Sequence, residues 1–357
     1  MTDTKSNSDP IRVGVAGLGR SGWDIHIRTL RHMGEKFKVV AVVDNLPERR
    51  KQAAEELGCK AYTSYGKLLA DPDVELAVVA MPTDLHVPWA VKALRAGKQV
   101  VVEKPVARNL RECDRLIKVA GETGLSVTVF QNRRYDATFL KIRELVTGGA
   151  LGRVNFLRYT GAGFGRRWDW QTVKARGGGQ LRNNVIHALD ELMEFSGPAD
   201  PEIFCKMDNV LSSGDAEDWV QLVLKAPDAP TMEVDIFSNC AYPQATWLVL
   251  GQKGSLTSAG SELKWKVVKG FESLPPRPLD LSPTPDRGYN REKLEFEESS
   301  WTEPPAPSGP NAPRPETMGF YDDVHASLRG GAPQKITLES VRRRMKVIDH
   351  CLKKCGI

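Results

Sequence analysis

A lysine that directly follows an apolar run is the first candidate for chemistry. It lies in the segment 100–105, which reads VVVEKP and contains Glu103 and Lys104. A lysine held beside a hydroxyl group can act as a general acid or base if its pKa is lowered. The run 99–102 predicts a strand, and open α/β sheets bind ligands at the carboxyl ends of their strands. We therefore predict a functional Lys104 rather than a surface lysine in an ion pair.

Asn183 and His187 form a second candidate pair, in the glycine-rich segment 177–190. Residues four apart share one face of a helix, so the two side chains would meet if the helix begins early enough. Histidine is the side chain best able to exchange a proton near neutral pH. A lone histidine at a helix start is more often a cap or a hydrogen-bonded structural group. The residues alone therefore leave the role of His187 open.

A pattern typical of dinucleotide binding lies near the start of the chain. Gly17, Gly19 and Gly22 form G-x-G-x-x-G between a predicted strand and a predicted helix. The first glycine allows a tight turn, the second lets the backbone approach a pyrophosphate, and the third lets the helix pack closely on the strand. The pyrophosphate would lie at the helix N-terminus, where free N–H groups favour anions. The alternative is a merely flexible turn.

The choice of dinucleotide depends on Asp44, which follows the next predicted strand. A carboxylate there can accept hydrogen bonds from both ribose hydroxyls and would repel a 2′-phosphate. This favours NAD, while Arg49 and Arg50 lie nearby and keep NADP as the alternative. The other interpretation of Asp44 is a helix cap.

The loop 166–170, which reads RRWDW, is the candidate for substrate contact. Aromatic faces with arginine and aspartate suit stacking on a sugar ring and hydrogen bonds to its hydroxyls. We predict substrate contact by Arg166 and Trp168, although two tryptophans in a loop can also be ordinary packing. Asn132 and Arg133, at the predicted junction between two domains, are weaker candidates.

The elements that would position these residues alternate between strand and helix over the first third of the chain. Apolar runs predict strands at residues 11–16, 38–43, 76–80, 99–102 and 125–130. Helical patterns lie between them, among others at 47–57, 88–96 and 109–121. Continuous apolar strands separated by helices predict a parallel sheet covered on both faces. We therefore expect a doubly wound α/β Rossmann domain over residues 1–131.

The pattern changes after residue 131. Helices are predicted at 135–147 and 187–195, and strands at 153–160, 203–211, 219–225, 232–238, 246–250 and 263–268. Successive strands joined by turns predict a large, mainly antiparallel sheet, so residues 132–316 are expected to form an α+β domain. Eleven of the 23 prolines fall within 271–316, which predicts a surface loop there.

Residues 317–357 are expected to form a C-terminal segment whose helix packs back on the first domain. Apolar residues recur in it at helical spacing. They are Val341, Met345, Ile348 and Leu352. The basic cluster 342–344 on the same helix is interpreted as its solvated face rather than as a nucleic-acid patch.

The composition of the chain limits the classes of protein to which it can belong. The chain has 357 residues, 41% hydrophobic and 27% charged, which is typical of a two-domain globular enzyme. The net charge of +5 is mild, and the first ten residues lack the apolar stretch of a secretory signal. No apolar run approaches the ~20 residues that span a bilayer. The six cysteines form neither a CxxC pair nor a metal-spaced cluster. We therefore expect reduced thiols, no metal, a cytoplasmic location, and neither nucleic acid nor membrane as a partner.

These segments, in this order, resemble the Gfo/Idh/MocA oxidoreductase family, which includes glucose–fructose oxidoreductase and inositol dehydrogenase. The resemblance covers nearly the whole chain. Besides the glycine turn, the lysine segment and the histidine segment, it includes residues 81–86 (MPTDLH), 131–134 (QNRR), 251–256 (GQKGSL), 320–321 (FY) and 328–333 (LRGGAP).

The resemblance implies NAD(P)-dependent hydride transfer between nicotinamide and a C–OH group of a sugar, polyol or glycoside. In the family the lysine at the position of Lys104 is catalytic, and the histidine at the position of His187 assists it. The resulting cofactor-binding set is Gly17, Gly19, Arg20, Ser21, Gly22, Asp44, Pro82, Thr83, His86, Glu103 and Lys104. The substrate set is Asn132, Arg133, Arg166, Trp168, Asn183 and His187.

Two histidines have a structural interpretation. His86 is also interpreted as a cap of the helix that follows it, and His26 shows no partner pattern and is taken as structural.

Asn183 stands where many family members carry aspartate, and an amide can neither take a proton nor supply negative charge. With less opposite charge beside it, Lys104 should have a lowered pKa. Whether Lys104 is then a better base, activity is reduced, or His187 carries the proton stays open.

Three functions follow from the resemblance, and we favour the first. The first is a dehydrogenase or reductase in which Lys104, assisted by His187 and Asn183, moves the hydroxyl proton. The second is an enzyme that uses a tightly held NAD to oxidise a sugar transiently and cleave a glycosidic bond. The third is a non-catalytic nucleotide-binding sensor. The resemblance also implies a homodimer or homotetramer formed through the large sheet.

Overall fold

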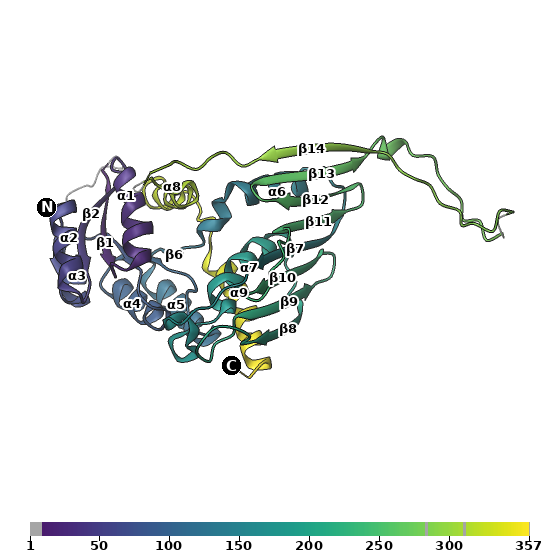
Figure 1. Ribbon diagram of the computed structural model, residues 1–357. Coiled ribbons are helices and arrows are strands. Elements are labelled where there is room, and N and C mark those ends of the chain that lie inside the picture. The colour runs from purple at the N-terminus through teal and green to yellow at the C-terminus, as the bar shows by residue number, and fades with distance from the viewer. Residues whose placement is uncertain (1–8, 283–284, 310–311, 357) are drawn as a thin grey trace.

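The computed structural model describes residues 9–282, 285–309 and 312–356, and Figure 1 shows the path of the chain. Residues 1–8, on which much of the prediction of no secretory signal rests, lie outside the described residues. So do 283–284 and 310–311 of the proline-rich stretch. Two sheets organise the rest of the molecule.

Sheet A has six parallel strands in the order β3-β2-β1-β4-β5-β6. The strands are β1 (Ile11–Ala16), β2 (Phe37–Val43), β3 (Lys60–Tyr62), β4 (Leu76–Val79), β5 (Gln99–Val102) and β6 (Val127–Val129). The helices that accompany them are α1 (Arg28–His32), α2 (Pro47–Leu57), α3 (Tyr65–Ala70), α4 (Thr83–Arg95) and α5 (Leu110–Thr123). Side chains of β1, β4 and β5 are almost all buried, as expected for strands covered on both faces. This confirms the predicted doubly wound α/β sheet.

Some elements around sheet A differ from the prediction. The short β3 and α3 were not indicated, because neither presents a long periodic pattern. α4 begins at Thr83, so Pro88 lies inside the helix and not at its start. Proline is most easily tolerated in the first turn of a helix, and this preference made Pro88 resemble a helix start.

Sheet B has eight strands in the order β14-β13-β12-β11-β7-β10-β9-β8. They are β7 (Val154–Ala162), β8 (Glu202–Asp208), β9 (Trp219–Lys225), β10 (Thr231–Phe237), β11 (Trp247–Gly251), β12 (Gly254–Ala259), β13 (Glu262–Val268) and β14 (Phe296–Thr302). Only the β7–β10 pair among these neighbours is parallel. The predicted large and mainly antiparallel sheet is therefore confirmed.

β14 corrects the expectation that 271–316 is entirely loop. It pairs with β13 along its whole length, and its residues are mostly exposed. An edge strand with both faces in water needs no alternation of apolar residues, so the sequence carried no signal for it. Between β13 and β14 the described residues 274–282 and 285–294 extend away from the sheet in Figure 1, and we call them the arm. Its two limbs are joined by the ion pair Arg277–Glu292, at 3.0 Å.

Helices cover one face of sheet B. These are α6 (Ala137–Thr147) and α7 (Ile186–Leu192), which lie on the same side of the strands in Figure 1. The Phe139 ring of α6 stacks on the Trp247 ring of β11, with 6.4 Å between ring centroids. On the opposite face the side chains of Phe204 and Leu250 are 52% and 36% exposed.

The chain ends with α8 (Pro315–Gly330) and α9 (Leu338–Lys354). The four apolar positions predicted for α9 are all buried. This helix contacts α5, because Arg342 forms an ion pair with Asp114 at 2.6 Å and Asp349 accepts a hydrogen bond from the Leu110 N–H.

One residue of the basic cluster 342–344 contradicts its interpretation as a solvated face. Arg344 is 2% exposed and forms ion pairs with Asp190 at 3.1 Å and Glu194 at 2.6 Å. It lies three residues after Val341 and four before Ile348, so helical periodicity places it on the buried face of α9. The buried carboxylate of Asp190 and the more exposed carboxylate of Glu194 compensate its charge there.

Candidate active site

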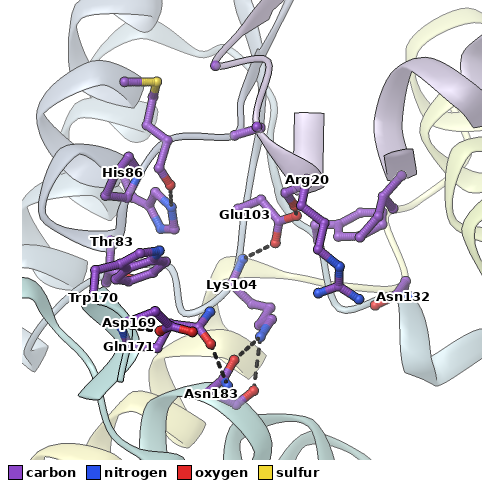
Figure 2. Close-up of a pocket in the computed structure, with 18 of the residues that line it drawn as sticks. Arg20, Thr83, His86, Glu103, Lys104, Asn132, Asp169, Trp170, Gln171 and Asn183 are labelled. Atoms are coloured by element: carbon purple, nitrogen blue, oxygen red, sulfur yellow. Dashed lines mark hydrogen bonds between the residues drawn. The ribbon is translucent and has the colours of Figure 1, made fainter. Parts of the chain in front are cut away.

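A cavity of about 1210 Å³ lies where the carboxyl ends of β1, β2, β4 and β5 meet the segment before α7. It brings together most residues of the predicted site. Those that line it are Gly17, Gly19, Arg20, Ser21, Asp44, Pro82, Thr83, His86, Glu103, Lys104, Asn132, Arg133, Asn183 and His187. Figure 2 shows Lys104 near its centre, pointing toward Asn183.

The three glycines of the turn differ in what surrounds them. Gly17 has φ +90°, and a Cβ on it would lie 2.6 Å from the Ala80 carbonyl oxygen. A Cβ on Gly22 would lie 1.8 Å from the Gly17 carbonyl oxygen, so Gly22 packs beneath the turn and does not line the cavity. Above Gly19 the nearest atom to a Cβ would be an Arg49 nitrogen at 3.9 Å. This open space at a helix start is the cradle that a pyrophosphate needs, so the turn fits the cofactor.

Asp44 follows β2 and lines the same cavity. Its Oδ2 accepts a hydrogen bond from the Leu18 N–H at 2.7 Å, and its Oδ1 accepts one from the Leu46 N–H at 2.8 Å. The Arg49 guanidinium lies 3.5 Å from Oδ2. Oδ2 also accepts a hydrogen bond from Arg49, whereas Oδ1 keeps a lone pair for a ribose hydroxyl, so Asp44 is both held by the backbone and available to a ligand.

Lys104 is held by the other half of the site. Its Nζ donates hydrogen bonds to the Asn183 carbonyl oxygen at 2.9 Å and to Asn183 Oδ1 at 3.3 Å. Burial lowers the pKa of Lys104 to about 8. Glu103 opposes this shift, while the charges of Arg133 and Arg20 reinforce it. The direction agrees with the expectation drawn from the neutral Asn183.

His187 and Asn183 reach the cavity from a π-helical turn, Leu181–Val185, that continues into α7. Asn183 Nδ2 donates to Gln171 Oε1 at 3.2 Å, which fixes the amide so that its oxygen faces Lys104. The His187 ring is buried, and its Nδ1 has no hydrogen-bond partner among the described residues. Burial, together with the charges of Lys104 and Arg133, holds the pKa of His187 well below its usual value. His187 is therefore neutral at pH 7.

A buried network beneath Lys104 was not predicted from the sequence. Glu103 accepts hydrogen bonds from Ser21 and from the Lys104 N–H, and His26 Nε2 lies 3.2 Å from Glu103 Oε1. The other ring nitrogen of His26 lies 2.7 Å from the Tyr321 hydroxyl oxygen. Although burial opposes ionisation, the hydrogen bond and charge of His26 hold the pKa of Glu103 below its usual value. The 295 residues between His26 and Tyr321 explain why no local signal could reveal this contact.

His86 does not cap the following helix. It lies inside α4 and is buried, and its two ring nitrogens lie 2.7 Å from the carbonyl oxygens of Pro105 and Met81. It therefore ties the loop that carries Lys104 to the loop that follows β4. This correction concerns its structural role, since His86 also lines the cavity as predicted.

The tryptophan loop meets the cavity through other residues than predicted. Arg166 and Trp168 do not line it, and Trp168 is 81% exposed. The neighbouring Arg167 and Asp169 do line it, followed by Trp170 and Gln171. Adjacent side chains of an extended segment point to opposite sides, so reaching the cavity at 167 and 169 turns 166 and 168 to solvent.

In the described ranges, no group of three or more His, Cys, Asp or Glu side chains is placed to hold a metal ion. No helix in those ranges is both long and apolar enough to cross a membrane.

The fold and the site together define a Rossmann-type nucleotide-binding protein whose ligand cavity is completed by the loop 167–171 and the segment that leads into α7. Residues 11–131 match the description "Oxidoreductase family, NAD-binding Rossmann fold", and residues 139–257 match the "GFO/IDH/MocA C-terminal domain". The chain therefore belongs to the Gfo/Idh/MocA family of oxidoreductases. This confirms the predicted family, the oxidoreductase class and NAD as the cofactor.

Relatives and solved structures agree with this assignment. Myo-inositol 2-dehydrogenase from Thermotoga maritima is 28% identical over 253 residues, which cover 69% of this chain and 74% of that protein. An NAD-binding protein from Listeria innocua is similar in structure with a TM-score of 0.80 at 25% identity, and 98% of each chain is covered. The WlbA dehydrogenase from Bordetella pertussis, solved with NADH and UDP-GlcNAcA, has a TM-score of 0.74 at 22% identity, again over 98% of each chain.

Proposed function

We propose that the protein is an NAD-dependent dehydrogenase or reductase that transfers a hydride between nicotinamide and a C–OH group of a sugar, polyol or glycoside. The observation that carries this proposal is the partly buried Lys104 amine, which is held by Asn183 at the carboxyl edge of sheet A. The Thermotoga maritima relative, named for myo-inositol, supports a polyhydroxylated substrate.

Lys104 is assigned the proton of the reacting hydroxyl group. A general base works best when its pKa is close to the working pH, and the pKa of Lys104 is about 8. The neutral amine takes the proton during oxidation, and the ammonium returns it during reduction. His187 is neutral, so its role is to hydrogen-bond the substrate rather than to carry the proton. Asn183 positions the Lys104 amine.

When bound, NAD supplies the hydride acceptor for oxidation of the substrate. The residues that would hold it are those of the glycine turn, with Arg20 and Ser21, and Asp44 at the ribose. Pro82, Thr83 and His86 after β4 would border it on the other side. The open space above Gly19 and the free lone pair on Asp44 Oδ1 support this assignment.

We also propose that two copies associate through the outer face of sheet B. Helices cover only the opposite face, and the apolar side chains of Phe204 and Leu250 stand exposed on the outer one. The arm, which extends away from the sheet, carries three more exposed apolar side chains. These are Leu279, Leu281 and Tyr289.

The test of the enzymatic proposal is NADH formation by the purified protein supplied with NAD and pooled sugars, polyols, sugar acids and glycosides. NADH that accumulates with the wild type and not with Lys104→Met would support a dehydrogenase. Fractionating an active pool would then identify the substrate.

The same samples distinguish the rival functions. Cleaved glycosides without net NADH would contradict the dehydrogenase and indicate an internal redox cycle. Bound NAD with neither NADH nor product, in both directions of reaction, would indicate a sensor.

A further inference from the structure

Two adjacent arginines at the edge of the cavity have opposite surroundings. Arg134 is fully compensated, since its Nε and Nη2 donate to the two oxygens of Asp190 at 2.6 and 2.7 Å and its Nη1 lies 3.3 Å from Glu194. Arg133 lines the cavity, and its Nη1 donates to the Tyr159 hydroxyl oxygen at 3.1 Å. Within residues 9–282, 285–309 and 312–356, no carboxylate lies within 4.0 Å of the Arg133 guanidinium.

The described carboxylates near Arg133 form no ion pair with it. Glu103 is held by Ser21 and His26, and Asp136 caps α6 by accepting from the Thr138 and Phe139 N–H groups. Glu191 lies one turn after His187 and is buried. Burial raises its pKa well above the usual value and so disfavours its charged form, although Arg133 opposes the shift. Burial also acts to lower the pKa of Arg133, and Tyr159, Glu191 and Asp136 hold that pKa above its usual value without any described carboxylate contacting the guanidinium.

Lys104 and Arg20 add further positive charge to the cavity, where Arg167 and Asp169 pair with each other at 2.7 Å. Lys104 adds a second positive charge when protonated, and the group nearest to its amine is the uncharged Asn183. Arg20 adds a third positive charge, but it belongs to the glycine turn, where the cofactor pyrophosphate is proposed to bind. Arg133 lies on the substrate side, close enough to Lys104 and His187 to influence the pKa of both.

A half-buried guanidinium loses hydration, and only a charge partner restores the lost free energy in full. Its planar fork matches the two oxygens of a carboxylate better than it matches single hydroxyl groups. Among the described residues the Tyr159 hydroxyl accepts from Nη1 and no carboxylate occupies the fork, whereas the carboxylate of a bound substrate can.

We propose that the substrate is a hydroxy acid of the sugar class, such as a uronic or aldonic acid, whose carboxylate binds Arg133. The inference rests on the proposed function, because it places the reacting C–OH group at Lys104. A carboxylate held by the Arg133 fork would orient the neighbouring carbon chain, so Arg133 would select among hydroxylated molecules that Lys104 alone would not distinguish.

The test compares acids with neutral counterparts of the same carbon skeleton. Glucuronate and glucose, galacturonate and galactose, and gluconate and sorbitol are titrated by calorimetry into the protein saturated with NADH. Glucose 6-phosphate serves as a differently shaped anion. At least one acid should bind roughly tenfold or more tightly than its neutral counterpart, as expected for hydrogen bonds to a charged group.

Variants test whether Arg133 causes the preference for acids over neutral sugars. Arg133→Gln should abolish the difference between acid and neutral sugar, and Arg133→Lys, which keeps the charge but loses the fork, should retain part of it. Arg143→Gln, on the exposed side of α6, removes the same charge elsewhere and should leave the preference unchanged. Thermal unfolding of each variant shows that the fold is kept.

The outcomes separate the two proposals. Equal binding of acids and neutral sugars, tighter binding of the phosphate, or a preference that survives in Arg133→Gln would overturn the carboxylate proposal. NADH formed from neutral polyols without any preference for acids would do the same and leave the dehydrogenase intact. Arg133-dependent binding of an acid with no NADH from any substrate would support the carboxylate site and contradict the dehydrogenase.

Discussion

At the scale of single residues, the site depends on how burial and neighbouring charges set the protonation of two groups. Lys104 is partly buried and His187 is buried, and each charged form is disfavoured by loss of water and by the positive charge of Arg133. These effects bring the pKa of Lys104 down toward neutral pH, to about 8, and move the pKa of His187 further below neutral pH. The two side chains therefore have different chemistry although they share one cavity.

Lys104→Met should lower kcat/KM roughly 10²–10⁴-fold, the usual contribution of a positioned acid or base. In the wild type, kcat/KM for oxidation should rise as the pH increases through about 8, because the neutral amine is the base. The reduction should show the opposite trend. The variant should lose this step in the pH profile, measured by NADH absorbance. Lys92→Met, an exposed change on α4, is the control, and a retained step in Lys104→Met would refute the assignment.

Asn183→Asp should move the same pH step upward by roughly one unit or more, because a carboxylate beside the Lys104 amine favours its charged form. The Gln171 amide can rotate to donate to the new carboxylate, so the local hydrogen bond is kept. Asn183→Ala removes the amide without adding charge and should not raise the step. An unchanged profile in Asn183→Asp would mean that Lys104 does not determine the step.

At the scale of elements, loops and helices from distant parts of the chain hold Lys104. Lys104 follows β5 at the edge of the sheet, and Asn183, in the segment before α7, contacts its amine. Tyr321 of α8 contacts His26, which in turn contacts Glu103. The glycine turn after β1 is also a feature of this scale, because its glycines have different roles. Gly17 allows the chain to turn, and Gly19 leaves room for a ligand.

Alanine substitutions at Gly17 and Gly19 should separate folding from cofactor binding. Gly17→Ala places a Cβ 2.6 Å from the Ala80 carbonyl oxygen at φ +90° and should cost about 1–3 kcal/mol of stability, measured by urea unfolding without NAD. Gly19→Ala points a methyl group into the cavity, so it should leave stability unchanged and weaken NAD at least about tenfold. Equal effects of the two variants on unfolding would contradict this division.

At the scale of the whole molecule, the cavity lies between the edge of sheet A and the segment that leads into α7, and no described helix covers the outer face of sheet B. α9 joins the two parts of the chain, since it contacts α5 while the buried Arg344 pairs with Asp190 of α7. The outer face of sheet B and the arm take no part in this packing (Figure 1). These are the surfaces that we propose for association with a second copy.

Phe204→Asp should dissociate that assembly, because it places a charge within the proposed apolar contact. Light scattering after gel filtration should show an oligomer for the wild type and a smaller mass for the variant. Ala332→Asp, an exposed position after α8, should behave like the wild type. A monomeric wild type, or an unchanged mass in Phe204→Asp, would exclude this interface.

The sequence by itself was sufficient for the features that depend on local pattern. Runs of apolar residues between helices determined the parallel sheet, G-x-G-x-x-G determined the turn, and the position of Lys104 after a strand placed it at a ligand-binding edge. These predictions succeed because strand and helix periodicity, and the backbone freedom of glycine, act over a few residues.

Only the tertiary structure decided which polar groups meet and which charges are cancelled. It brought His26 into contact with Tyr321, buried Arg344 and exposed Trp168 to solvent. It also paired Arg134 with a carboxylate and Arg133 with the Tyr159 hydroxyl. No local sequence pattern distinguishes these two arginines, because they are adjacent in the chain. Burial and Coulomb interactions depend on distances between residues far apart in the chain, so only the folded molecule determines them.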